Sequence, residues 1–144
     1  STAVAHAQWA FHEGGNGAED YPAVWQEDRG AEYELAIACD ITDYSLQIVL
    51  STPHSTASLG GPGPVAMSLS VDGDVNMPLD ASLIDDGGVA IIVAREAEDE
   101  QVGAVAIALM DGRDNLALRY FDTRLSFAMD GMEKASLDLM FSCL

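Results

Sequence analysis

Two cysteines carry the most reactive side chains of this chain, and their positions limit the chemistry they can perform. Cys39 lies inside an alternating apolar run and is followed by Asp40, while Cys143 is the penultimate residue. A nucleophilic thiol needs a neighbouring base in an electropositive setting, which an apolar run beside a carboxylate does not provide. We therefore expect a structural disulfide between Cys39 and Cys143, formed outside the reducing cytoplasm. Two buried free thiols in a cytosolic protein are the alternative.

Histidines and serines give no sign of a catalytic site. His6 and His12 share a parity in a possible first strand, but they would lie about 20 Å apart there, too far to bind one metal ion. His54, between Pro53 and Ser55, is expected to be a solvated loop residue with a possible role in an interaction surface. No serine lies in a G-x-S-x-G nucleophile elbow. We therefore expect no catalytic residues and a protein that is not an enzyme.

Carboxylates are abundant, and two short groups of them could offer oxygen ligands to calcium. Asp72 and Asp74 form one group, and Asp85 and Asp86 form the other. Neither extends to the long ligand pattern of an EF-hand loop, and aspartates in turns usually hydrogen-bond the local backbone. We therefore expect no metal site and keep these four aspartates as weak calcium candidates. The chain also lacks a Walker loop and a dinucleotide-binding glycine pattern, so no cofactor is expected.

The charge of the chain excludes several classes of partner. Its 144 residues include 24 acidic and 6 basic side chains, for a net charge of −18. Such a surface repels phosphate backbones and anionic lipid, so nucleic acid is not an expected partner. No apolar run approaches the roughly 20 residues that span a bilayer, so membrane insertion is not expected. A protein partner, cationic partners included, or self-association remains compatible with this charge.

The elements that must position these residues are mostly strands. Apolar residues alternate with polar or small ones in 34–41, 44–50 and 65–71, which predicts strands with one buried face. The runs 87–95 and 102–110 are more apolar throughout, which predicts strands covered on both sides. Asp-Gly turns separate these runs. The Ser-, Gly- and Pro-rich residues 51–64 are expected to form one long loop, and residues 95–101 a charged hairpin tip.

The pattern changes to a helical one near the C-terminus. Asp130 and Glu133 have the spacing of a capping box. The apolar side chains that follow recur at helical spacing, and they are Met132, Ala135, Leu139, Met140 and Cys143. A helix this short needs a sheet to pack against. The expected disulfide would pin it there.

These elements predict a mainly β fold. We expect an antiparallel β-sandwich of about eight to ten strands with one C-terminal helix, with a closed β-barrel as the alternative. Residues 9–144 would form a single domain, after a flexible N-terminal arm or signal-peptide remnant in residues 1–8, where Ala5-His6-Ala7 has the shape of a cleavage site. Trp9 and Phe11 are expected in the core. For Trp25, which follows Tyr21, a core role is favoured over an exposed one, although both are candidates for an interaction surface.

The order of these features resembles a known type of exported protein. An early tryptophan strand, "LAIACDITDYSLQIVL", "VAMSLSVDG" and a closing "LSFAMDG…A…L…C" resemble small exported bacterial proteins of the invasion-associated locus B type. They also resemble periplasmic accessory proteins associated with type VI secretion. The resemblance spans most of residues 9–143. It implies a non-enzymatic β-sandwich in the cell envelope, with no catalytic residues to carry over.

Three functions are compatible with these features. The first is an exported, non-catalytic protein-interaction module of the bacterial cell envelope, periplasmic or extracellular. The second is a self-assembling structural subunit in which residues 1–8 add a strand to the sheet of a neighbour. The third is a small-ligand carrier or enzyme that uses residues 51–64 as a lid.

Overall fold

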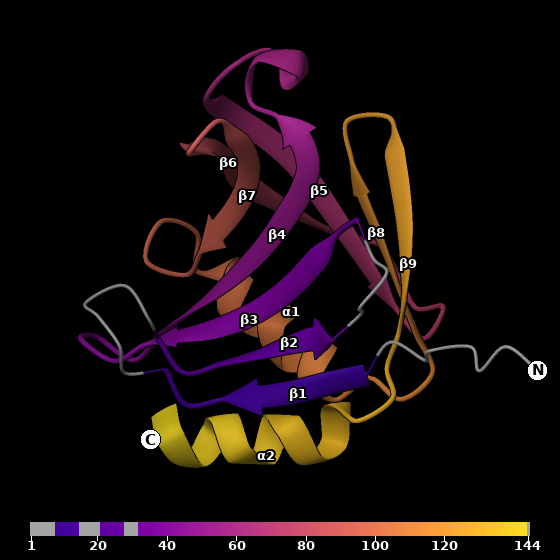
Figure 1. Cartoon of the computed structure of the whole chain (residues 1–144). Helices are drawn as coiled ribbons and strands as arrows, with labels where there is room; N and C mark the ends of the chain where they lie inside the picture. The colour runs from indigo at the N-terminus through magenta and orange to yellow at the C-terminus, as the bar shows by residue number, and fades with distance from the viewer. Residues whose placement is uncertain (1–7, 15–20, 28–31, 144) are drawn as a thin grey trace, which may run out of the picture.

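The computed structural model of the chain describes residues 8–14, 21–27 and 32–143. Over these residues the chain alternates between strands and short turns, with two α-helices and one 3-10 turn (Figure 1). The first strands are β1 (Gln8–His12), β2 (Ala23–Glu27), β3 (Glu34–Asp40) and β4 (Ser45–Ser55), and the 3-10 turn η1 (Ala57–Leu59) follows. The later elements are β5 (Gly63–Val71), β6 (Met77–Asp86), β7 (Val89–Arg95), α1 (Gln101–Met110), β8 (Asn115–Tyr120), β9 (Thr123–Ala128) and α2 (Met132–Cys143).

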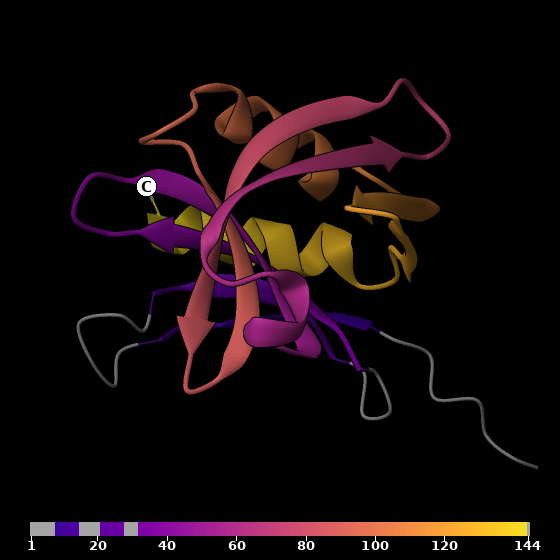
Figure 2. The same ribbon diagram turned by 90° about the horizontal axis from the view of Figure 1, so that it is seen from above.

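The nine strands of the described residues form one antiparallel sheet, which confirms the predicted mainly β fold and strand number. Their order is β1-β2-β3-β4-β7-β6-β5-β8-β9. The sheet curls strongly on itself, as Figure 2 shows from above. It shares features with both expected architectures. Like a barrel, it joins every strand into one hydrogen-bonded sheet; like a sandwich, it keeps two edge strands, β1 and β9.

A few hydrogen bonds bring the two ends of the sheet together. The backbone N–H of Trp9 donates to the carbonyl of Asp130 at 2.8 Å, just beyond the end of β9. The indole Nε1 of Trp9 donates to the carbonyl of Ala128 at 2.9 Å, and the amide of Gln26 donates to the same oxygen at 3.2 Å. Gly131 has a φ of 82°, and a Cβ there would lie 2.6 Å from the carbonyl oxygen of Trp9. A glycine is therefore required where the chain closes the curl.

The core lies on the inner face of the sheet and follows the predicted alternation. On β3 the buried residues are Leu35, Ile37 and Cys39. On β4 and β5 they are Leu46, Ile48, Leu50, Val65, Met67, Leu69 and Val71. Trp9 is also buried and Phe11 packs against the core, as predicted. The alternation fails only at the β3–β4 turn, where Ile41 and Tyr44 were grouped with the inward residues but are exposed, because the chain reverses there.

The first α-helix contradicts the sequence prediction. Residues 102–110 were expected to form a strand, but they lie in α1 (Gln101–Met110). Of the expected hairpin tip at 95–101, residues 96–100 form the connection from β7 into this helix. The buried side of α1 has helical spacing and comprises Val102, Gly103, Val105, Ala106, Leu109 and Met110. The side chain of Asp99 accepts the N–H of Gln101 at 3.0 Å and so holds the first turn.

The C-terminal helix and the disulfide agree with the sequence prediction. Cys39 and Cys143 are bonded to each other, with their Cα atoms 5.9 Å apart. α2 contacts β1, β2 and β3, whereas α1 contacts β4, β5 and β6, so the two helices together cover the inner face. The partly exposed Met140 does not share the buried side predicted for it. Within the described residues, neither helix is long enough and apolar enough to cross a membrane.

The predicted long loop is also wrong over much of its length. β4 continues through Ser55 and β5 begins at Gly63, so residues 56–62 alone connect the two strands. The hydroxyl of the buried Thr52 donates to the carbonyl of Ala90 at 2.8 Å, which holds this end of β4 against β7. The register shifts between Ser51 and Ser55, and such an irregularity accommodates a proline inside a strand. Residues 51–55 and 63–64 of the segment envisaged as a lid thus lie in strands.

Candidate functional site

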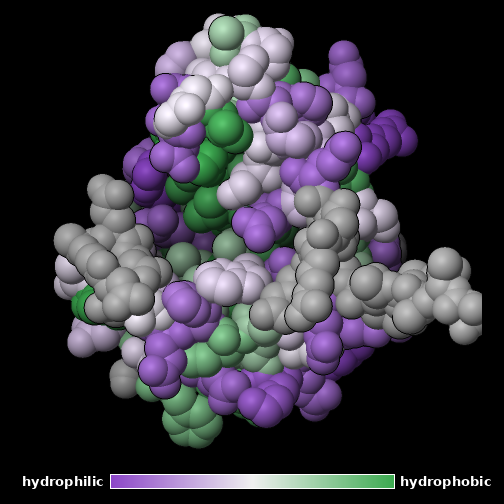
Figure 3. Space-filling view, in the orientation of Figure 1, coloured by the Kyte–Doolittle hydropathy of each residue, from purple (hydrophilic) through white to green (hydrophobic). Residues whose placement is uncertain are grey.

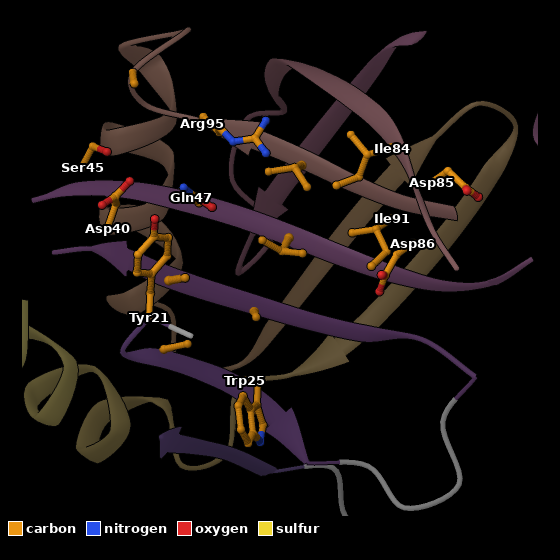
Figure 4. A pocket seen from close by; sticks show the side chains of 16 residues that line it. Tyr21, Trp25, Asp40, Ser45, Gln47, Ile84, Asp85, Asp86, Ile91 and Arg95 are labelled. Carbon is orange, nitrogen blue, oxygen red and sulfur yellow. The ribbon is translucent and has the colours of Figure 1, made fainter. Parts of the chain in front are cut away.

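The outer face of the sheet carries a long groove, and the side chains that line it are more apolar than those on a typical solvent-facing sheet surface. The groove has a volume of about 670 Å³ and crosses β2, β3, β4, β7 and β6. Its floor consists of the side chains that alternate with the core residues, and these are Ala23, Ala36, Ala38, Val49, Ile84, Ile91 and Val93. Figure 3 shows a hydrophobic area over this part of the sheet. Figure 4 shows the side chains that line the groove.

Strand register explains why these side chains make one surface. Trp25 is paired with Ala36, Ala36 with Val49, and Val49 with Val93, so one apolar row runs straight across four strands. Directly opposite residues on neighbouring strands lie about 5 Å apart and contact one another. A parallel row through Ala23, Ala38, Gln47 and Arg95 is more polar. Because Ala23, Ala36 and Ala38 have small side chains, the groove is deepest over these residues of β2 and β3.

Trp25 and Tyr21, two of the predicted interaction residues, both line this groove. Trp25 is half-buried on the outer face, so the core role favoured for it is wrong; its neighbour Val24 takes the inward position. The imidazole of His12 stacks on the indole of Trp25, with ring centroids 4.5 Å apart. This stack fixes a large aromatic surface at one side of the groove, where Figure 4 shows Trp25.

One end of the groove carries an ionised carboxylate. Oδ1 of Asp40 accepts hydrogen bonds from the hydroxyl of Thr42 at 2.6 Å and from its N–H at 2.9 Å. These bonds, with a further one from the Tyr21 side chain, lower the pKa of Asp40. Arg95 lies at the same end and pairs with Glu98 at 3.5 Å. Asp40 and Arg95 are the charged side chains that line this end of the groove, and the pairing of Arg95 with Glu98 leaves one net negative charge among the three.

The opposite end of the groove carries two more carboxylates, Asp85 and Asp86, beside Ile84 and Ile91 (Figure 4). The hydroxyl of Thr56 donates a hydrogen bond to Oδ1 of Asp85. That bond orients one carboxylate and leaves its charge in place. The site thus has an apolar middle and an acidic residue or pair at each end.

His54, the third predicted interaction residue, lies outside the groove. Its Nε2 is 3.1 Å from the hydroxyl of Tyr33, which is 2.8 Å from the hydroxyl of Tyr120. Tyr120 is buried, and this burial, followed by its hydrogen bond with Tyr33, raises the pKa of Tyr120 strongly. A phenol held neutral in this way supports packing between β3, β4 and β8 rather than acid–base chemistry near neutral pH.

The four calcium candidates do not converge on one point. Asp72 accepts three backbone N–H groups, from Arg113, Asp114 and Asn115, at 2.8–3.0 Å. Asp85 and Asp86 lie at the groove instead. Among the described residues, no group of three or more histidine, cysteine, aspartate or glutamate side chains has a geometry that could hold a metal ion.

Sequence reasoning missed the residues that make the groove apolar. The alternation in β4 predicts that the side chain of Val49 faces solvent. The uniformly apolar β7 does not reveal which way Ile91 and Val93 point. The available signal was the small or apolar character of the outward positions of 34–41 and 44–50, where Ala36, Ala38 and Val49 replace the usual polar residues.

Comparison with known proteins adds no functional information. No protein-family model matches this chain. No curated protein and no solved structure matches it either. The function is therefore argued from the groove itself.

Proposed function

We propose that this protein is an exported, non-catalytic interaction module that binds a protein partner in the groove on the outer face of its sheet. The observation that supports this function is the apolar row from Trp25 to Val93, which lies on the face that a one-sided sheet normally turns to water. The disulfide between Cys39 and Cys143 favours an oxidising compartment such as the periplasm or the extracellular space.

The layout of polar groups favours a polypeptide segment over a small molecule. Small-ligand sites enclose most of their ligand and orient it with a few polar groups that converge on one point. Here the carboxylates stand at opposite ends, near Asp40 and near Asp86. The floor between them is mostly alanine, valine and isoleucine, with Gln47 and Arg95 near the Asp40 end. An elongated partner that covers the floor from end to end uses all of these features.

The proposed function is tested with a random peptide library displayed on phage. Peptides are selected on the wild-type protein and depleted on Val49→Asp, which places a charge in the middle of the floor. We expect selected peptides to bind the wild type at least tenfold more tightly than the variant. They should also shift the backbone amide NMR signals of β3, β4 and β7. Peptides that bind both proteins equally, or an empty selection, would overturn the proposal.

Two further variants protect this test from a folding artefact. Ala38→Leu fills the low part of the floor with an aliphatic side chain on the open face, so it should block binding without adding charge. Ala117→Asp makes the same change as Val49→Asp at an exposed position of β8, outside the groove, and should leave binding unchanged. Amide spectra of all three variants establish that each is folded before binding is compared.

A further inference from the structure

We propose that the groove takes an extended segment of a different protein, with alternating aliphatic side chains in the middle and a lysine or arginine at each end. This inference rests on the proposed function and specifies the chemistry of the partner. It follows from three features of the groove: the apolar floor, the acidic ends and the distance between those ends.

The acidic ends call for cationic groups. Asp40 is held ionised by the hydrogen bonds of Thr42 and Tyr21. Asp86 is exposed at the opposite end, beside Asp85. A cation placed between apolar side chains and a carboxylate is attracted more strongly than one in open water, because part of the screening solvent is displaced. An anionic segment would meet repulsion at Asp86 and along the approach, since the whole chain carries −18. At the other end it would face Asp40 beside an Arg95 that is already paired with Glu98.

The register of the strands sets the length of the segment. Asp40 is paired with Ser45, and Asp86 with Val89, so the two aspartates lie about eight residue positions apart along the strands and three strand spacings apart across them. With about 3.3 Å per residue and 4.8 Å per strand, the ends are at most about 30 Å apart, and the curl of the sheet shortens this. An extended chain covers that span with about nine residues.

Charge also excludes a second copy of this chain as the favoured occupant. Two molecules that each carry −18 repel one another, and the groove would add its own carboxylates to that repulsion. Charge complementarity between a negative groove and a positive segment speeds their association and fixes the register of the segment in the groove. The partner is therefore a separate protein with a basic, aliphatic segment.

The probe for this inference is a synthetic extended peptide of about nine residues, with capped ends, a lysine at each end, valines at alternate positions and serines between them. Lysines and valines then face the same side of the peptide. Matched peptides carry glutamine or glutamate in place of both lysines. Binding is followed by amide NMR titration of the wild type and of Asp40→Asn, Asp86→Asn and Val49→Asp. Asp122→Asn, at an exposed position in the β8–β9 turn, is the charge control.

We expect the lysine peptide to bind the wild type, with at least a tenfold loss for the glutamate peptide and for Val49→Asp. Each of Asp40→Asn and Asp86→Asn should weaken binding severalfold, while Asp122→Asn should have no effect. Added salt should weaken the lysine peptide more than the glutamine peptide. Light scattering of the free protein should give the mass of a monomer.

Each contrary outcome overturns a defined part of the inference. Equal binding of the lysine peptide to wild type and Val49→Asp would mean general attraction to an acidic surface. No binding of the lysine peptide, or equal binding of the glutamate peptide, would reject the basic ends. In either case, the proposed function would still stand if peptides selected from the library bound the wild type but not Val49→Asp. A dimer that dissociates in Val49→Asp would identify a second copy as the occupant and reject a separate partner.

Discussion

Asp72 lies in the turn after β5, yet its carboxylate organises a different part of the chain. It accepts the backbone N–H groups of Arg113, Asp114 and Asn115 and so holds the connection between α1 and β8. These three bonds lower its pKa below the ordinary value of 3.8. Asp72 also adopts a φ of 53°, which aspartate and asparagine tolerate better than most residues. The role of Asp72 is therefore structural.

The variant Asp72→Asn should be less stable than the wild type at neutral pH. Asparagine can keep the acceptor oxygen that faces Asp114 and Asn115, but its NH₂ group would face the N–H of Arg113. Because the folded pKa of Asp72 is lowered, its contribution is complete above about pH 3.8 and is lost as the pH falls through the folded pKa.

Urea unfolding followed at pH 7 and near pH 3 checks this prediction. The difference in unfolding free energy between wild type and Asp72→Asn should be present at pH 7 and should narrow near pH 3. The matched control is Asp74→Asn, which removes an exposed charge in the same turn. A difference that stays constant with pH, or an equal effect of Asp74→Asn, would contradict the role given to the Asp72 carboxylate.

At the scale of the elements, α1 depends on a contact that its sequence does not reveal. Oε1 of Glu96 accepts the N–H of Leu46 at 2.9 Å, and the N–H of Glu96 donates to the carbonyl of Leu46 at the same distance. This pair extends the ladder between β4 and β7 beyond the end of β7. Gly103 of α1 packs directly on the Glu96 carboxylate, and a Cβ there would overlap it. The helical glycine thus leaves room for the carboxylate of Glu96, which lies just after β7.

Gly103→Ala should destabilise the protein, although alanine is the better helix former. The helix alone would gain about 1 kcal/mol. Displacing the Glu96 carboxylate would leave the N–H of Leu46 without its acceptor, at a cost of about 1–3 kcal/mol. In the background of Glu96→Ala, where that bond is already absent, Gly103→Ala should instead stabilise by about 0.5–1 kcal/mol. The double-mutant cycle, measured by urea unfolding, would refute this coupling if Gly103→Ala had the same sign in both backgrounds.

The elements that could be predicted are those in which one periodicity dominates. Alternation located the inward faces of β3, β4 and β5, and the change to helical spacing located α2. It failed for residues 101–110, because an apolar run that is buried on most sides fits either a strand or a helix. The signals that favour a helix are its alanines and Asp99, whose side chain accepts the N–H of Gln101, and both signals are weak on their own.

The candidate site was predictable only in part, for a related physical reason. Trp25 and Tyr21 stood out by residue type and do line the groove, whereas His54 stood out equally and lies elsewhere. The groove itself depends on which strands are neighbours. β4 pairs with β7 rather than with β5, and that non-local pairing brings Val49 beside Val93. Nothing in the local sequence specifies such a pairing.

At the scale of the whole molecule, two opposing effects act on the fold. The net charge of −18 favours expansion, since like charges that lie within the screening length of one another repel. The disulfide opposes expansion, because it joins α2 to β3 across a sequence separation of 104 residues. Both sulfur-bearing side chains are buried, and the bond links the end of α2 to the third strand of the sheet.

Removal of this disulfide should therefore cost much of the stability. Closing a loop of about 100 residues restricts the unfolded chain by roughly 4–5 kcal/mol in the chain-entropy treatment, and measured losses are usually about 2–5 kcal/mol. We expect Cys39→Ala/Cys143→Ala to lower the free energy of unfolding by an amount in that range. Urea is the suitable denaturant, because a guanidinium salt would also screen the acidic surface. The free energy of unfolding of the wild type in a thiol reductant should match that of the double variant. The reductant should not change the free energy of unfolding of the double variant itself. An unchanged urea midpoint for the double variant would mean that packing alone holds α2 on the sheet and that the bond contributes nothing to the fold.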